Sequence, residues 1–227
     1  MILLNKPMLF HAVALALAAG ALVAAPAGAK PAHGKKAAHR TTPAKKYPAA
    51  VSPGVPDVGQ WKPDADLLAQ LQPERSFGAF RLRLPVDYTV EEQDMSTPKS
   101  RITGYLAKGP TRTDGSFPVM IIFVGVAAPG LSTGSADGLL NGNQAINGMP
   151  GLVKTNMQDG EANGLQLVRQ YFKYLLRPGS SRLEHGFQYA TTDGQTDAIV
   201  AALDPEPYND TTLPLAEAAA LTLHRAP

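Results

Sequence analysis

The sequence predicts an α+β domain, an α/β/α sandwich built on a largely antiparallel sheet. Three observations predict it. Apolar and polar residues alternate in several short segments. A continuous apolar run at 117–126 is typical of a central strand covered on both faces. An Asp-Gly pair at 193–194 suits the turn of a hairpin. Hairpin-linked strands with few crossover helices favour antiparallel pairing.

The first half of the domain is predicted to be rich in short strands. Asp64 is placed to cap a short helix that Pro73 ends. The segment 80–84 alternates apolar residues with arginines, which predicts a half-buried strand. The same period of two recurs more weakly at 88–90 and 102–106. The central strand 117–126 follows these segments.

The second half is predicted to contain a long loop, a helix, a strand, a hairpin and a closing helix. These segments are 128–148, 149–157, 164–176, 185–203 and 215–223. Gly, Asn and Ser dominate the first of them, whereas Met149, Leu152 and Met157 fall on one helical face of the second. The third fits a helix or a strand, and we predict a strand because a hairpin follows it. Pro214 suits the first turn of the closing helix.

The N-terminal residues 1–29 have the pattern of a secretory signal peptide. Lys6 precedes an apolar run, and Ala27-Gly28-Ala29 supplies a small-x-small cleavage site. An uncleaved membrane anchor is the alternative, because the apolar stretch approaches spanning length. We expect cleavage, which places the chain in the periplasm or outside the cell and leaves no transmembrane segment in the mature chain.

Residues 30–60 are predicted to form a flexible basic linker before a single domain at 61–227. Repeated prolines and few apolar residues leave this segment little to bury. The chain carries seven Lys and Arg and no acidic residue before Asp57, and 14 basic against 19 acidic residues from there on. The linker therefore acts as a tether, with or without adhesion to an acidic envelope surface. The candidate binding residues are its cations Lys35, Lys36, Arg40, Lys45 and Lys46.

Composition excludes several classes of site. The chain has no cysteine, which excludes a disulfide scaffold, a thiolate metal centre and a cysteine nucleophile. The region after Asp57 has two histidines, His185 and His224, and neither lies in a metal-ligand motif. We therefore expect no metal and no cofactor, and the acidic domain predicts no specific nucleic-acid binding.

A serine hydrolase is the alternative function. Gly130-Leu131-Ser132-Thr133-Gly134 matches the nucleophile-elbow pattern after an apolar strand. Asp197 or Asp204, followed by His224, would supply the acid and base of a triad. Against this hypothesis, residues 135–138 are poor helix formers, and an elbow needs a helix directly after it. We therefore favour a non-catalytic domain.

Three stretches together resemble the extracytoplasmic domains related to PsbP. They are the strand at 80–85 with Tyr88 after it, the hairpin from Gly186 through Gly194, and the helix after Pro214. The resemblance covers about residues 76–227 and implies an α/β/α sandwich in a non-catalytic docking role. It implies an accessory domain whose partner is an envelope protein or an acidic envelope surface, and it leaves the oligomeric state open.

Overall fold

The computed structural model describes residues 59–96, 100–127, 134–176 and 178–227. The predicted signal peptide and the linker up to residue 58 lie outside these ranges. The strands are β1 Gly59–Gln60, β2 Arg75–Phe77, β3 Phe80–Leu82, β4 Thr89–Asp94, β5 Ser100–Lys108, β6 Val119–Ala127, β7 Val153–Lys154, β8 Gln158–Ala162, β9 Leu165–Leu175, β10 Leu183–Thr192, β11 Thr196–Pro205 and β12 His224–Arg225. The helices are α2 Ala65–Leu68, α3 Ala136–Gly142, α4 Gln144–Asn147 and α5 Asn209–Ala220.

Within the described residues, nine strands form one large sheet. Their order is β1-β8-β9-β10-β11-β6-β5-β4, and β7 pairs with β9 at one side. Every pair in it is antiparallel except β1 with β8. The predicted hairpin is β10–β11, in which Thr192 lies opposite Asp197. The predicted strand at 164–176 is β9. The largely antiparallel sheet is therefore confirmed.

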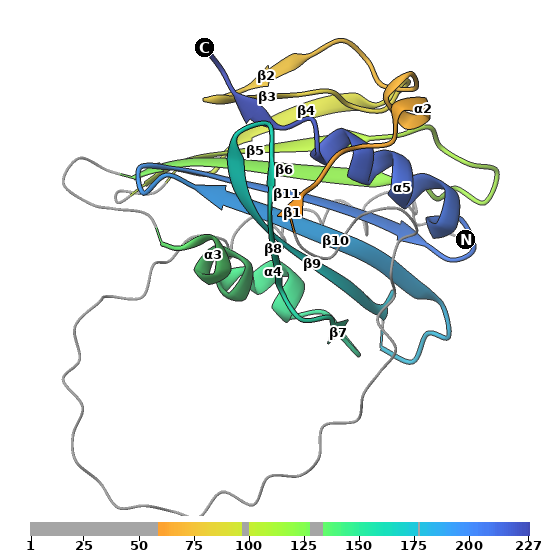
Figure 1. Cartoon of the computed structure of the whole chain (residues 1–227). Helices are drawn as coiled ribbons and strands as arrows, with labels where there is room; N and C mark the ends of the chain where they lie inside the picture. Colours follow the sequence, from red (N-terminus) through yellow and green to blue (C-terminus); the bar gives the residue numbers. More distant parts are fainter. Residues whose placement is uncertain (1–58, 97–99, 128–133, 177) are drawn as a thin grey trace, which may run out of the picture.

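Both faces of this sheet are covered (Figure 1). One face carries α2, α5 and a small sheet in the order β12-β3-β2. The other face carries α3 and α4. Each side encloses an apolar core: Phe77, Phe80 and Leu223 belong to the first, and Leu140 and Phe172 to the second. This arrangement is the predicted α/β/α sandwich, with a small sheet added to one outer layer.

The central strands are buried because both faces are packed. Every residue of β11 is buried, and so are Met120 through Gly125 of β6. Burying such continuous apolar strands is the main favourable contribution to folding, at about 25 cal/mol for each Å² of apolar surface. The continuous apolar run at 117–126 therefore predicted a central strand correctly.

The helix predicted at 149–157 is wrong. That segment contains the short strand β7, and Met149, Leu152 and Met157 reach the second core from extended chain and turns. Helices form instead in the segment predicted as a loop, where Ser135 caps α3 by accepting a hydrogen bond from Gly138 N at 3.1 Å. Burial of Leu139 and Leu140 of α3 against the sheet outweighs the poor helix propensity of its Gly and Asn residues.

The closing helix begins earlier than predicted. α5 begins at Asn209 and ends at Ala220, so Pro214 lies inside it and not in its first turn. The Tyr208 carbonyl accepts from Thr211 N at 3.2 Å and from Thr212 N at 3.3 Å, which starts the helix before the proline. The alanines of α5 allow its backbone to lie close to the sheet, where Ala216 and Ala219 are buried.

Trp61 fixes the start of the described domain. Gly59 and Gln60 of β1 pair with Gly160 and Glu161 of β8. The Trp61 side chain, 1% exposed, packs across Gly160. The chain therefore joins the sheet two residues before the predicted domain boundary. No helix in the described ranges is long and apolar enough to cross a bilayer.

Candidate functional site

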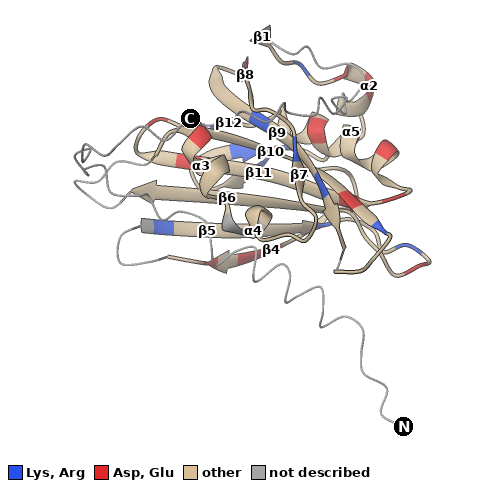
Figure 2. Cartoon of the chain, turned by 90° about the horizontal axis from the view of Figure 1, so that it is seen from below, with Lys and Arg blue, Asp and Glu red and all other residues tan. Residues whose placement is uncertain are grey.

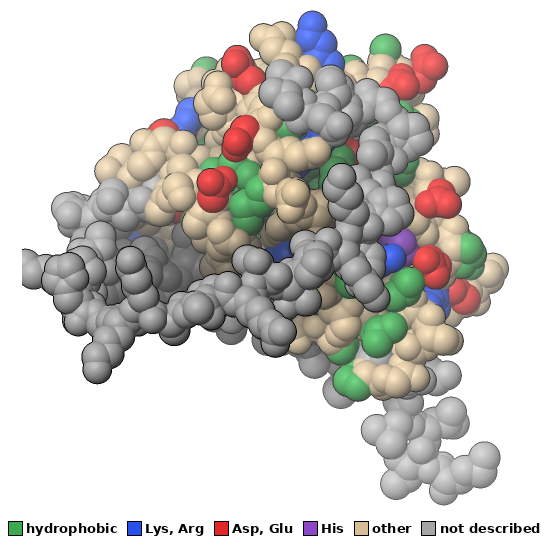
Figure 3. All heavy atoms as spheres, turned by 60° about the horizontal axis from the view of Figure 1, so that its bottom comes forward, with side chains coloured by type: hydrophobic (Ala, Val, Ile, Leu, Met, Phe, Trp, Pro, Cys, Tyr) green, Lys and Arg blue, Asp and Glu red, His purple; other side chains and the backbone are tan. Residues whose placement is uncertain are grey.

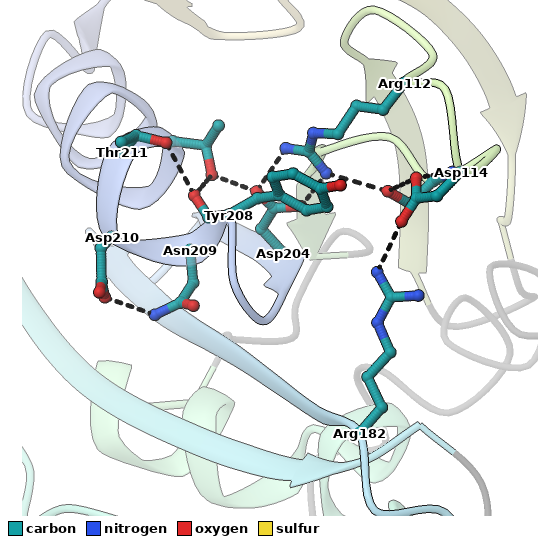
Figure 4. Close-up of polar contacts among 10 residues, drawn as sticks. Arg112, Asp114, Arg182, Asp204, Tyr208, Asn209, Asp210 and Thr211 are labelled. Atoms are coloured by element: carbon teal, nitrogen blue, oxygen red, sulfur yellow. Dashed lines mark hydrogen bonds and ion pairs between the residues drawn. The ribbon is translucent and has the colours of Figure 1, made fainter.

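A cluster of polar side chains lies where β11 ends, around Arg112 and Asp204 (Figure 4). Arg112 follows β5 in a loop, and Asp204 is the penultimate residue of β11. The guanidinium donates to both carboxylate oxygens of Asp204, at 2.7 and 2.6 Å. It also lies over the ring of Tyr208, 4.1 Å from the centroid. Thr212 of α5 donates its hydroxyl proton to the same carboxylate. The cluster therefore ties a loop to the beginning of α5.

A second ion pair extends the cluster toward solvent. Arg182, between β9 and β10, lies 3.2 Å from Asp114 Oδ2. Asp114 also accepts from the backbone of Ser116 at 2.9 Å and from its hydroxyl at 2.6 Å. The hydrogen bonds from Ser116, with the nearby Arg182 charge, lower the pKa of Asp114. Three separate segments thus meet through paired charges.

The charges of this cluster are paired within the domain. Burial opposes the charge of Arg112, but its hydrogen bonds and charge pairing with Asp204 outweigh burial and raise its pKa. Burial and the Asp204 charge raise the pKa of Tyr88, against the opposing effect of Arg112. The contacts of Asp204 with Arg112 and Thr212 hold the loop after β5 and the beginning of α5 together.

The structure does not bring His224 and Asp204 together. Arg225 pairs with Asp193 at the β10–β11 turn, which places neighbouring His224 near the start of β11. Asp204 lies eight residues after the start of that strand, about 26 Å along it at about 3.3 Å per residue. The nearest polar groups to the His224 ring are the Thr222 carbonyl at 3.0 Å and Glu74 at 3.7 Å. Asp204 therefore does not orient His224 as a triad acid would.

Ser132 lies outside the described residues. Residues 136–142 form the helix α3 despite their poor helix propensity, and this helix begins four residues after Ser132. The linker cations Lys35, Lys36, Arg40, Lys45 and Lys46 also lie outside the described ranges. Within those ranges, His, Asp and Glu side chains form no group of three or more that could hold a metal ion.

A buried charge network lies between α5 and the large sheet, and the sequence reasoning missed it. Arg169 of β9 and Glu217 of α5 are 2% and 3% exposed, with 3.7 Å between Nη1 and Oε1. Tyr171 and Tyr189 donate their hydroxyl protons to Glu217, the second at 2.6 Å. The Arg169 guanidinium lies 4.5 Å from the centroid of the Trp61 ring. Hydrogen bonds and a cation–π contact thus offset the cost of burying both charges.

The opposite face of the sheet carries a buried carboxyl group. Glu184 of β10, 6% exposed, accepts the hydroxyl proton of Tyr174 from the neighbouring strand. Burial raises the pKa of Glu184, and the Asp204 charge adds to this effect, whereas the Tyr174 hydrogen bond and the Arg182 charge oppose it. Burial also raises the pKa of Tyr174. The folded state therefore favours the protonated form of Glu184.

This raised pKa predicts that Glu184 makes stability depend on pH. A group with a raised folded pKa contributes its full stability below the unfolded pKa, and that stability is lost as pH rises through the folded pKa. Glu184→Gln keeps an oxygen for Tyr174 and removes the ionisation. The free energy of unfolding would be measured in urea at pH 4.5 and pH 7. Relative to the native chain, Glu184→Gln should be more stable at pH 7 than at pH 4.5. Parallel pH profiles of the two proteins would contradict this prediction.

Charges are dispersed over the face that carries α3 and α4. Figure 2 shows acidic and basic residues interspersed there, and Figure 3 shows hydrophobic and charged side chains mixed over the same side. The exposed large apolar residues of the described domain, Val86, Val126 and Val153, lie on separate segments. Among the residues that the structure describes, charges of both signs are thus interspersed on this face.

Comparison with known proteins identifies the fold. No protein-family model and no curated protein matches the sequence. The solution structure of cyanobacterial PsbP (CyanoP) from Synechocystis sp. PCC 6803 matches at 15% identity with a TM-score of 0.50, covering 70% of this chain and 94% of that one. The fold is PsbP-like. LpqN of Mycobacterium tuberculosis, involved in cell envelope biogenesis, matches at 12% identity and a TM-score of 0.47, over 69% of this chain and 87% of that one.

The PsbP-like fold confirms the resemblance at the level of architecture. The three stretches that carried it form β3, the β10–β11 hairpin and α5. All three are structural elements of the domain. The likeness therefore concerns the fold, and the function must be argued from the charges and side chains of this chain.

Proposed function

We propose that the protein is an exported, non-catalytic accessory domain that its basic linker attaches to an acidic surface of the cell envelope. The observation that carries this proposal is the separation of charge along the chain. Every charged residue before Asp57 is basic, whereas acidic residues outnumber basic ones in the rest. Any attraction to an acidic surface therefore depends on the linker, and the folded domain recognises its envelope partner by other means.

The contacts of the folded domain support a non-catalytic role. Asp204 binds Arg112 and Thr212, and Glu217 binds two tyrosine hydroxyls, so the buried carboxylates serve the packing of α5. The His185 ring lies beside the surface residue Glu206. The His224 ring lies beside the Thr222 carbonyl and the surface residue Glu74. The PsbP-like fold is a further support, because it accommodates a docking role without catalytic residues.

Neutralising the linker cations should abolish this attachment. The chain beginning at Lys30 would be compared with a variant carrying Lys35→Gln, Lys36→Gln, Arg40→Gln, Lys45→Gln and Lys46→Gln. We expect the unmodified chain to bind isolated envelopes at about 0.05 M salt and to be released at about 0.5 M, because salt screens exposed charges. The variant should stay in the supernatant at both concentrations, as measured by sedimentation.

The matched control removes exposed cations from the domain instead. Lys173→Gln with Arg182→Gln changes two charges on the large sheet and its connecting loop, and leaves the linker intact. This control should bind as the unmodified chain does. Retention that neither salt nor neutralisation of the linker changes would refute electrostatic attachment.

A further inference from the structure

The small sheet β12-β3-β2 concentrates positive charge on an acidic domain. Its eight residues include three arginines and His224, and no aspartate or glutamate. Phe77, Phe80 and Leu82 point inward and are completely buried. Ser76, Arg81 and His224 lie on the outer face, whereas Arg75 and Arg225 pair with Leu82 and Phe80 and leave the inner face at the ends of their strands. We refer to these three strands as the cationic sheet.

The register of the cationic sheet places polar side chains in one row. Ser76 of β2 and His224 of β12 both pair with Arg81 of β3, so the three side chains share the outer face. Directly opposite residues in an antiparallel pair have Cβ atoms about 5 Å apart. At the rim, the guanidinium groups of Arg75 and Arg225 lie 5.8 and 5.0 Å from the ring centroids of phenylalanines in the first core. The row is therefore held by backbone pairing and by a packed apolar layer beneath it.

Two acidic residues beside the cationic sheet form ion pairs with residues of β12. Asp193 pairs with Arg225, and Glu74 lies 3.7 Å from His224. No ion pair to Arg75 or Arg81 occurs among the residues that the structure describes. Arg75 is exposed and Arg81 is half-buried with its Nε enclosed, so both charges can attract an external anion without a competing carboxylate from the described part of the domain. Arginine presents a planar set of N–H groups that matches phosphate oxygens.

The linker joins the domain on the same side of the large sheet. Trp61, two residues after the first described residue, belongs to the same apolar core as Phe77 and Phe80 of the cationic sheet. A surface that binds the linker therefore lies within reach of the cationic sheet. Once the linker is bound, the second contact forms at a high effective concentration.

We propose that the cationic sheet docks on the phosphate groups of an anionic phospholipid bilayer, as the domain's own contact beside the linker. This inference rests on the envelope attachment proposed above and names its surface. The exposed large apolar residues Val86, Val126 and Val153 all lie outside the three strands. The contact is therefore made with headgroups, without insertion into the acyl region.

The experiment compares vesicles of phosphatidylglycerol mixed with phosphatidylcholine, vesicles of phosphatidylcholine alone, and soluble poly-L-glutamate. Chains beginning at Lys30 would be used, either unmodified or as the double variant Arg75→Gln/Arg81→Gln. The linker variant with five substitutions and the control Arg182→Gln complete the set. Arg182 precedes β10, whereas Arg225 of the cationic sheet pairs with Asp193 at the opposite end of that strand. Circular dichroism verifies that each variant is folded.

We expect the unmodified chain to bind the anionic vesicles and not the neutral ones. The double variant Arg75→Gln/Arg81→Gln should lower the partition coefficient about 25-fold, which is about fivefold for each arginine. Arg182→Gln should leave the partition coefficient unchanged. Loss of binding in the linker variant alone, with Arg75→Gln/Arg81→Gln equal to the unmodified chain, overturns the inference and leaves the proposed attachment intact. Binding to poly-L-glutamate without binding to anionic vesicles also overturns it, because the surface is then an acidic polymer.

Discussion

Glu217→Gln should lower the free energy of unfolding by about 3–5 kcal/mol, although the side chain keeps its size and shape. The amide keeps an oxygen that can accept from Tyr171 and Tyr189. What it removes is the negative charge beside Arg169, a guanidinium that is 2% exposed. A buried charge without its counter-charge cannot recover its lost hydration, so this substitution measures the cost of leaving Arg169 without Glu217.

The double variant Arg169→Met/Glu217→Gln provides the control. It removes both charges and keeps the long side chain at 169 and the oxygen at 217. Buried ion pairs replaced as a pair often cost little, so the double variant should be more stable than Glu217→Gln alone. Urea unfolding, followed by circular dichroism, gives the four free energies of the cycle. Additive effects of the two substitutions would contradict a coupled pair.

The strands of the large sheet could be predicted because their signals are local. The apolar run of β6 and the Asp193-Gly194 turn each lie within one short segment of sequence. The turn also shows why the prediction held, since the Asp193 carboxylate accepts from the backbone of Gln195 and Thr196 at 2.9 and 2.7 Å. Side chains that bind their own backbone fix a turn without help from the rest of the fold.

The small sheet and α3 could not be predicted because their stability comes from distant partners. β12 has two residues, and it pairs with β3, which lies more than 140 positions earlier in the chain. α3 has weak intrinsic propensity and forms because Leu139 and Leu140 find a core made by other strands. Short elements of this kind follow from tertiary burial, which no local pattern encodes.

The candidate binding residues of the domain also include some that local sequence predicts and others that only the fold brings together. Alternation at Arg81 and Arg83 predicted the strand, and it also contained the signal for a charged outer face. The residues of β12 in the cationic sheet come from the C-terminal end of the chain, so their convergence with β2 and β3 appears only in the folded state. The same holds for Arg112 and Asp204, whose hydrogen bonds join residues 92 positions apart.

Trp61→Ala should lower the free energy of unfolding by about 3–5 kcal/mol, the usual effect of deleting a large buried aromatic side chain. Trp61 is 1% exposed and meets the edge of Tyr189, with 5.6 Å between ring centroids. Because it directly follows β1, it also holds the end of the linker on the sheet. The loss should appear as a lower urea midpoint in unfolding followed by circular dichroism.

Gly160→Ala tests the same contact from the opposite side. A Cβ at Gly160 would lie 2.3 Å from Cε2 of Trp61, so the indole must move, at a cost of about 1–3 kcal/mol. Trp61 is the only tryptophan in the chain, and its emission therefore reports directly on this displacement. We expect Gly160→Ala to shift the emission to longer wavelength and to increase acrylamide quenching. Gly142→Ala is the matched control, since nothing lies within 4 Å of its added carbon. Equal spectra and equal midpoints for the two alanine variants would show that Trp61 does not pack on β8.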